Sequence, residues 1–235
     1  MKRALSSTLL LAITSTLTIG MAVPAEAAEL SKSETERQTS QPLEVLETLE
    51  SQGDIEASVD SYPTVATDGN SSELQNGNVG LKTNLGGATY VEGKITTVAS
   101  DDHNIIYENL QSGDSRAVIQ IDSPDAPTSY SFEMTGEYTS LAMREDGGID
   151  ALDADSNIVA SVDAPWAYDA DGDAVPTYFT IDGNTITQVV EHNESFDYGI
   201  VADPTLREHI KKVIARCLGV LGAVTCLGGI VYQYL

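Results

Sequence analysis

Basic residues are scarce in this sequence, and their scarcity limits what the protein can bind. The 235 residues include 12 Lys+Arg against 36 Asp+Glu, which gives a formal net charge of −24 at pH 7. A chain with this balance repels phosphate backbones, so we expect no nucleic-acid partner. The length allows one or two small domains.

Cysteine, histidine and tryptophan are also rare, with two, three and one residue respectively. Two cysteines exclude a disulfide-dense scaffold and a cysteine-ligated metal cluster. The histidines are far apart in the sequence and show no metal-ligand spacing. Gly113-Asp114-Ser115 resembles the nucleophile motif of one class of hydrolases, but the Asp-x-x-His that such an enzyme needs is absent near the end of the chain. We therefore interpret these three residues as a hairpin turn. We therefore predict a non-enzymatic protein with no catalytic residues and no cofactor.

The N-terminus has the features of a secretory signal peptide. Lys2 and Arg3 precede an uncharged stretch over 4–21, and Ala25-Glu26-Ala27 fits the small-x-small cleavage pattern. The sequence predicts a signal peptide over 1–27 and a secreted protein, extracellular or associated with the cell surface. The alternative is an N-terminal membrane anchor.

Residues 28–86 are rich in Ser, Thr, Glu, Gln, Asn and Gly and poor in aromatic residues. Such a composition buries too little apolar area to offset the entropy of ordering, so we expect a largely disordered linker. Near 42–52, however, leucines recur every three residues. Pro42 suits the first helical turn and Gly53 suits a C-cap, which predicts a short helix there.

The range 88–204 changes to alternating polar and apolar residues, separated by turn signals such as Asp182-Gly183-Asn184. Many short strands at this spacing predict a mainly β domain, an antiparallel β-sandwich or open barrel. The expected strands lie near residues 95–100, 104–110, 116–122, 128–134, 140–144, 158–162, 178–181 and 185–191.

The C-terminal segment, residues 205–235, differs from the rest in charge and in spacing. It contains four basic residues and one acidic residue, whereas residues 28–204 contain six basic and 34 acidic residues. Apolar residues from Ile210 to Leu221 recur at helical spacing, which predicts a cationic apolar C-terminal helix or helical hairpin. Lys211, Lys212 and Arg216 are the candidate contacts with membrane lipid.

Cys217 and Cys226 are the candidate disulfide. On a continuous helix they lie about 13.5 Å apart at 1.5 Å per residue, which is too far for a bridge. Gly219 and Gly222 could break the helix, and an exported protein meets oxidising surroundings. We expect a hairpin-like segment with the bridge, and the alternative is two unpaired thiols on an unbroken helix.

Three short motifs carry a resemblance to a known family. Pro165-Trp166-Ala167, Val175-Pro176-Thr177-Tyr178 and Val201-Ala202-Asp203-Pro204 resemble segments of secreted actinobacterial proteins of uncharacterised function. Where that family has Tyr-Pro-Val before the last motif, this chain has Tyr198-Gly199-Ile200. The resemblance implies secretion, a β-rich domain and a variable apolar tail, and it transfers no catalytic residues.

Two aspartate-rich turns and one tryptophan suggest weaker possibilities. Asp169, Asp171 and Asp173 occupy positions 1, 3 and 5 of a calcium loop, but Ala174 and Thr180 replace its glycine and glutamate. We favour polar turns over weak Ca²⁺ binding and predict no metal site. For Trp166 we favour a packed residue over a sugar-stacking platform.

The C-terminal segment decides between the functional hypotheses. It is a buried helix on the β domain, a membrane anchor, or a segment that acts on anionic bilayers from outside. The first fits a secreted non-enzymatic protein of unknown role and the last a bacteriocin-like precursor. A cell-surface adhesion or ligand-binding module is a further alternative. The expected partners are membrane lipids or another cell-surface component.

Overall fold

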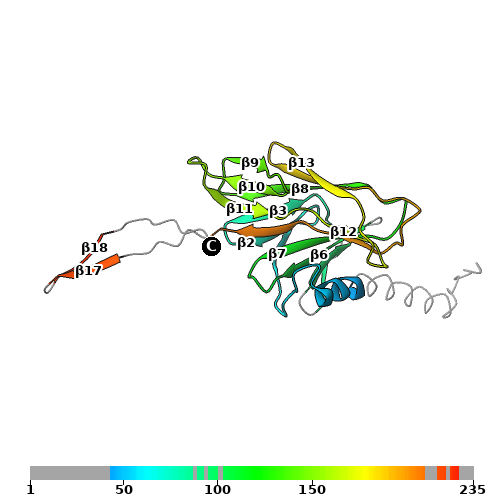
Figure 1. Cartoon of the computed structure of the whole chain (residues 1–235), viewed down its shortest axis with the longest axis horizontal. Helices are drawn as coiled ribbons and strands as arrows, with labels where there is room; N and C mark the ends of the chain where they lie inside the picture. The colour runs from blue at the N-terminus through cyan, green and yellow to red at the C-terminus, as the bar shows by residue number, and fades with distance from the viewer. Residues whose placement is uncertain are drawn as a thin grey trace, which may run out of the picture. The chain divides into compact units, whose positions relative to one another are not determined.

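The computed structural model describes residues 43–86, 89–92, 95–99, 103–209, 216–220 and 223–227. The predicted signal peptide lies outside these residues. Two antiparallel β-sheets form the body of the protein, and they do not close into a barrel (Figure 1). The predicted mainly β, sandwich-like fold is therefore confirmed.

The first sheet has six strands in the order β1-β2-β3-β8-β14-β13. Its members are β1 (Thr64–Thr67), β2 (Ser72–Asn76), β3 (Val79–Thr83), β8 (Ser129–Gly136), β13 (Thr177–Asp182) and β14 (Thr185–Val190). β8 and β14 alternate buried and less buried residues, as strands with one face on a core do.

The second sheet follows the order β4-β5-β6-β7-β16-β11-β10-β9, and β15 pairs with both β7 and β12. Its members are β4 (Thr89–Glu92), β5 (Ile95–Ala99), β6 (His103–Asn109), β7 (Ser115–Ile121), β9 (Ser140–Met143), β10 (Ile149–Leu152), β11 (Ile158–Val162), β12 (Ala167–Tyr168), β15 (Ile200–Ala202) and β16 (Thr205–Glu208).

The main core lies between the two sheets. Leu81, Phe132 and Ile186 of the first sheet belong to the same buried cluster as Ile119 and Leu206 of the second. Burial of such side chains is the dominant favourable contribution to folding, at about 25 cal/mol per Å² of apolar surface.

Part of the outer face of the second sheet is also buried, under apolar side chains from residues 45–55. A helix over 43–52 places Leu46 and Leu49 in a second cluster with Ile106 of β6, Val118 of β7 and Val201 of β15. β7 is consequently buried along its whole length. Its alternation, with Ala, Ile and Ile facing the main core and Arg, Val and Gln facing the helix side, follows from this double burial.

The linker predicted over 28–86 is wrong for its later part. β1, β2 and β3 lie within 64–83, and β3 pairs with β8 inside the first sheet. Leu74 and Leu81 are fully buried in the main core. The composition did not indicate these strands, because they are short, largely polar and free of aromatic residues. Tight turns at Gly69 and Gly77 connect them, and together they bury only a few aliphatic side chains.

The helix predicted within 205–235 is wrong for the residues that the structure describes there. Residues 205–208 form β16, which pairs with β7 and β11 in the second sheet. Farther along, β17 (Arg216–Val220) and β18 (Ala223–Leu227) form a separate two-stranded antiparallel sheet. Val220 and Val224 favour extended backbone, and glycines weaken a helix, so the apolar period was a poor guide.

No helix within the described ranges has both the length and the apolar character needed to cross a membrane.

Candidate functional site

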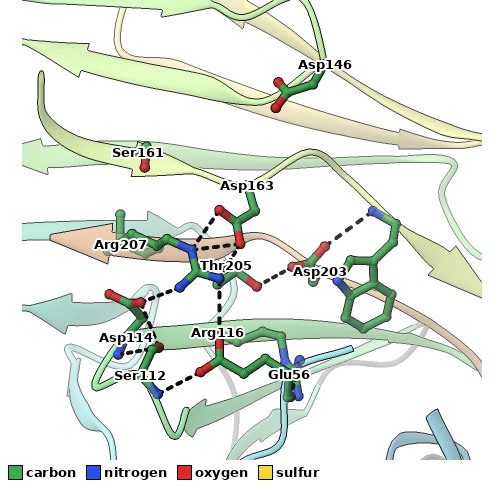
Figure 2. A network of polar contacts seen from close by, with 12 residues as sticks. Glu56, Ser112, Asp114, Arg116, Asp146, Ser161, Asp163, Asp203, Thr205 and Arg207 are labelled. Atoms are coloured by element: carbon green, nitrogen blue, oxygen red, sulfur yellow. Dashed lines mark hydrogen bonds and ion pairs between the residues drawn. The ribbon is translucent and has the colours of Figure 1, made fainter. Parts of the chain in front are cut away.

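A network of charged residues lies on the outer face of the second sheet, at the level of β6, β7 and β16. It joins residues from the N-terminal segment to residues of the last strand of the sandwich. Figure 2 shows Arg207 at its centre, with Asp163, Asp114 and Glu56 around the guanidinium group. The members of the network are Glu50, Glu56, Glu108, Asp114, Arg116, Asp163, Asp203, Thr205 and Arg207.

Arg116 of β7 is 1% exposed, and its guanidinium group donates hydrogen bonds to three residues. Its Nε donates to Oε1 of Glu108 at 2.6 Å, and Glu108 is also 1% exposed. Its Nη2 donates to Oε1 of Glu50 on the helix at 3.2 Å, and its Nη1 donates to the carbonyl of Glu56 at 3.1 Å. Its Cζ lies 5.5 Å from the ring centroid of Trp166, at cation–π distance.

Arg207 of β16 holds three carboxylates. Its Nε and Nη2 donate to both oxygens of Asp163 at 2.7–2.9 Å, the paired geometry that arginine and carboxylate favour. Its Nη1 donates to Asp114 at 2.5 Å, and its Nη2 also donates to Glu56 at 3.2 Å. These hydrogen bonds raise the pKa of Arg207 above its ordinary value, with Asp163 contributing most.

Glu56 connects the N-terminal segment to the β6–β7 turn. Its Oε1 accepts a hydrogen bond from the amide of Ser112 at 2.7 Å, and its Oε2 faces Arg207. Burial alone raises the pKa of this carboxyl, but the hydrogen bonds from Ser112 and the charge of Arg207 outweigh burial and lower it. Glu56 is therefore held ionised at the junction.

Asp203 is the most unusual acid of the network. It is 1% exposed and sits between β15 and β16, where the hydroxyl of Thr205 donates to its Oδ2 at 2.5 Å. The amide of Trp166 donates to its Oδ1 at 3.4 Å. Burial raises the pKa of Asp203 to about 7, against the opposing effects of Thr205 and Arg116.

This network holds the N-terminal segment against the second sheet through ion pairs and hydrogen bonds. Its carboxylates outnumber its two arginines, so protonation of Asp203 relieves part of the like-charge repulsion. The bonds fasten Glu50 and Glu56 to β7 and β16, and they include no assembled nucleophile and base. Sequence reasoning missed this site, because residues that are hydrogen-bonded in it lie up to 151 residues apart in the chain. A lone Arg116 within an otherwise uncharged strand was the available signal.

Asp169 serves a turn rather than a cluster of ligands. Its Oδ1 accepts hydrogen bonds from the amides of Asp171 and Asp173, and its Oδ2 accepts one from Asp197. These bonds occupy the carboxylate of the first calcium candidate with backbone donors, as in an Asx turn. Within the described residues, no group of three His, Cys, Asp or Glu side chains is arranged to hold a metal ion.

The other predicted contact residues fall in or near the separate hairpin. Lys211 and Lys212 lie outside the described residues. Arg216 begins β17, and Cys217 is the register partner of Cys226 across the β17–β18 pair.

Two histidines contact hydroxyl groups that sequence reasoning had not linked to them. The Nε2 of His209 lies 3.0 Å from the hydroxyl of Ser161, and the Nδ1 of His192 lies 3.0 Å from the hydroxyl of Tyr198. A hydrolase also needs a carboxylate that orients the histidine. Among the described residues, neither histidine has a carboxylate as a hydrogen-bond partner.

The side chain of Trp166 packs against the protein rather than extending into solvent. It is half-buried against the second cluster, with its ring 5.8 Å from that of Tyr168 and beside Arg116.

Comparison of the chain with protein-family models, curated proteins and solved structures gives no match.

Proposed function

We propose that this is an exported, non-enzymatic protein in which an acidic β-sandwich carries a cationic C-terminal segment that acts on anionic membranes. The segment comprises residues 210–235. It contains Lys211, Lys212 and Arg216 and no acidic residue. The signal-peptide pattern over 1–27 supports export.

The end of the sandwich coincides with the change of charge, and this coincidence carries the proposal. Arg207 and Glu208 belong to β16, and Arg207 is engaged by three carboxylates of the sandwich. After His209 every charged residue is basic. The described strands of this segment, β17 and β18, pair with each other and with no strand of the sandwich.

The acidic sandwich gives the segment a reason to be inactive in the intact chain. Each basic residue near an anionic lipid surface contributes about 1 kcal/mol to binding, and apolar burial adds to this. A tethered domain with a large negative charge opposes approach to the same surface, most strongly at low salt, where screening is weak. We therefore propose that release of the segment from the sandwich activates it.

Vesicle leakage tests this proposal. We compare the 210–235 peptide, the mature chain 28–235 and a chain ending at His209 on phosphatidylglycerol-containing vesicles and on neutral phosphatidylcholine vesicles. The peptide is expected to release dye from the anionic vesicles, the mature chain much less, and the shortened chain not at all.

A charge-matched variant sharpens the comparison. The peptide with Lys211→Gln, Lys212→Gln and Arg216→Gln should lose roughly a hundredfold in affinity for anionic vesicles, since about 1 kcal/mol per residue corresponds to such a factor. Its affinity for neutral vesicles should change little. A peptide that is as inactive as the intact chain contradicts membrane action, and binding of the intact chain to cells would then favour the adhesion hypothesis.

A further inference from the structure

The register of the β17–β18 hairpin places the only two cysteines of the chain opposite each other. Cys217 is the Cα partner of Cys226, and the neighbouring pairs run from Arg216–Leu227 to Val220–Ala223. Eight residues separate the cysteines in sequence. Their juxtaposition therefore depends on this register, and a shift by one residue would place them on opposite faces.

The position of this pair along the hairpin suits a covalent link. Two residues join Val220 to Ala223, so the pair at the loop exchanges hydrogen bonds, and hydrogen-bonded and non-hydrogen-bonded pairs alternate from there. Counting back, Cys217–Cys226 is a non-hydrogen-bonded pair. Such pairs have Cα atoms about 4.5 Å apart, which is inside the range of about 4.4–6.8 Å found for disulfides.

The hairpin also needs a stabilising link. In the described part of the chain, β17 and β18 form a sheet of two strands with no third partner. An isolated two-stranded hairpin is marginally stable at best in water, because it has no sheet or helix to pack against. A bond between the strands at their far end from the loop removes much of the freedom of the unpaired chain.

We propose that Cys217 and Cys226 form a cross-strand disulfide that staples the C-terminal hairpin. This inference rests on the proposed export, which brings the chain into an oxidising compartment. The two thiols lose two protons and two electrons as the S–S bond forms. The disulfide of a thiol oxidoreductase, or glutathione disulfide, accepts them and becomes two thiols.

The proposed disulfide would fix the conformation in which the C-terminal segment reaches the membrane. A closed ring from Cys217 to Cys226 keeps the strands paired after release from the sandwich, so the free segment does not pay again for ordering at the bilayer. Reduction should then lower the leakage activity of the segment while the sandwich stays folded.

Mass spectrometry of the full mature chain, recovered from the medium of an expressing culture, tests the bridge. We expect the intact mass to rise by two hydrogen atoms on reduction, and alkylation of both cysteines only after reduction. A reduced chain that glutathione disulfide also fails to oxidise would overturn the proposal. A bridged chain whose 210–235 peptide is inactive on vesicles would instead contradict the proposed function and leave the bridge standing.

A register control separates a hairpin bridge from random pairing of two thiols. Exchanging the residues at 225 and 226, as Thr225→Cys with Cys226→Thr, keeps the composition but places the new cysteine opposite Leu218. With glutathione disulfide this variant should oxidise at least tenfold more slowly than the natural chain. Restoring a pair with Gly219→Cys and Val224→Cys in a Cys217→Ser, Cys226→Ser chain should recover rapid oxidation. Equal rates for all three chains would contradict the register on which the bridge depends.

Discussion

At the residue scale, Arg116 is a fully buried cation of the sandwich. Its guanidinium group and the carboxylate of Glu108 are both 1% exposed and in contact. Removing two such charges from water costs several kcal/mol per ion, and their mutual attraction offsets this only when both are present. The pair therefore joins β6 to β7 and is costly to break.

Replacing Arg116 by glutamine should lower the free energy of unfolding by about 3–5 kcal/mol, because it leaves Glu108 buried without a cation. The matched control is Arg144→Gln, whose ion pairs with Asp146 and Asp150 are more exposed and should cost about 0–1 kcal/mol. Urea unfolding measures both. The double variant Arg116→Met with Glu108→Leu should recover more than half of the loss, and equal effects of the two single variants would contradict the assigned role.

Asp203 makes stability depend on pH with a defined sign. Its pKa is raised from 3.8 to about 7 in the folded state by burial. Between these values the folded chain holds a proton that the unfolded chain has released, so this residue lowers the free energy of unfolding as the pH rises from about 4 to about 7. The penalty is complete above pH 7 and absent below pH 4.

Asp203→Asn should remove this dependence, since asparagine keeps a carbonyl that accepts from Thr205 and carries no titrating proton. The free energy of unfolding of the variant should equal that of the natural chain near pH 4, apart from a constant offset, and should exceed it increasingly as the pH rises to 8. Urea midpoints at the two pH values provide the measurement. Asp182→Asn, at an exposed position, is the control and should follow the natural chain. Parallel pH profiles for Asp203→Asn and the natural chain would refute the assignment.

At the element scale, the sequence predicted most strands between residues 95 and 191 and missed others, among them β10 and β15. The expected ranges 95–100, 158–162 and 185–191 correspond to β5, β11 and β14 within one or two residues. In β14 the period of two is set by a single buried face. β15 is buried on both faces, so it shows no alternation of polar and apolar residues. Its Val201 and Ala202 were noted only as part of the Val-Ala-Asp-Pro motif.

The candidate site could not be predicted from the sequence, for a related reason. Glu50 meets Arg116 because the helix over 43–52 covers part of the outer face of the second sheet, and no local pattern reveals which face a helix covers. Alternation within β7 did indicate that Arg116 and Val118 share a face. The identity of their partners depends on contacts far apart in sequence, which periodicity does not encode.

At the scale of the whole molecule, the boundary between the sandwich and the C-terminal segment lies after His209 rather than after Pro204. β16 fills the position between β7 and β11 in the second sheet. Its Leu206 is fully buried in the main core, and its Arg207 closes the charged network. Without β16, the second sheet divides into two parts and Asp163 and Asp114 lose their cation.

Two shortened chains test this boundary. A mature chain ending at His209 should keep the free energy of unfolding within about 1 kcal/mol of the full chain, because it retains every described strand of the sandwich. A chain ending at Pro204 should fail to fold, because burial of Leu206 alone is worth about 2–5 kcal/mol and marginal domain stability does not survive its loss together with that of the Arg207 ion pairs. Circular dichroism and urea unfolding distinguish the two chains. A cooperative transition in the shorter one would place β16 outside the folding unit and return the boundary to Pro204.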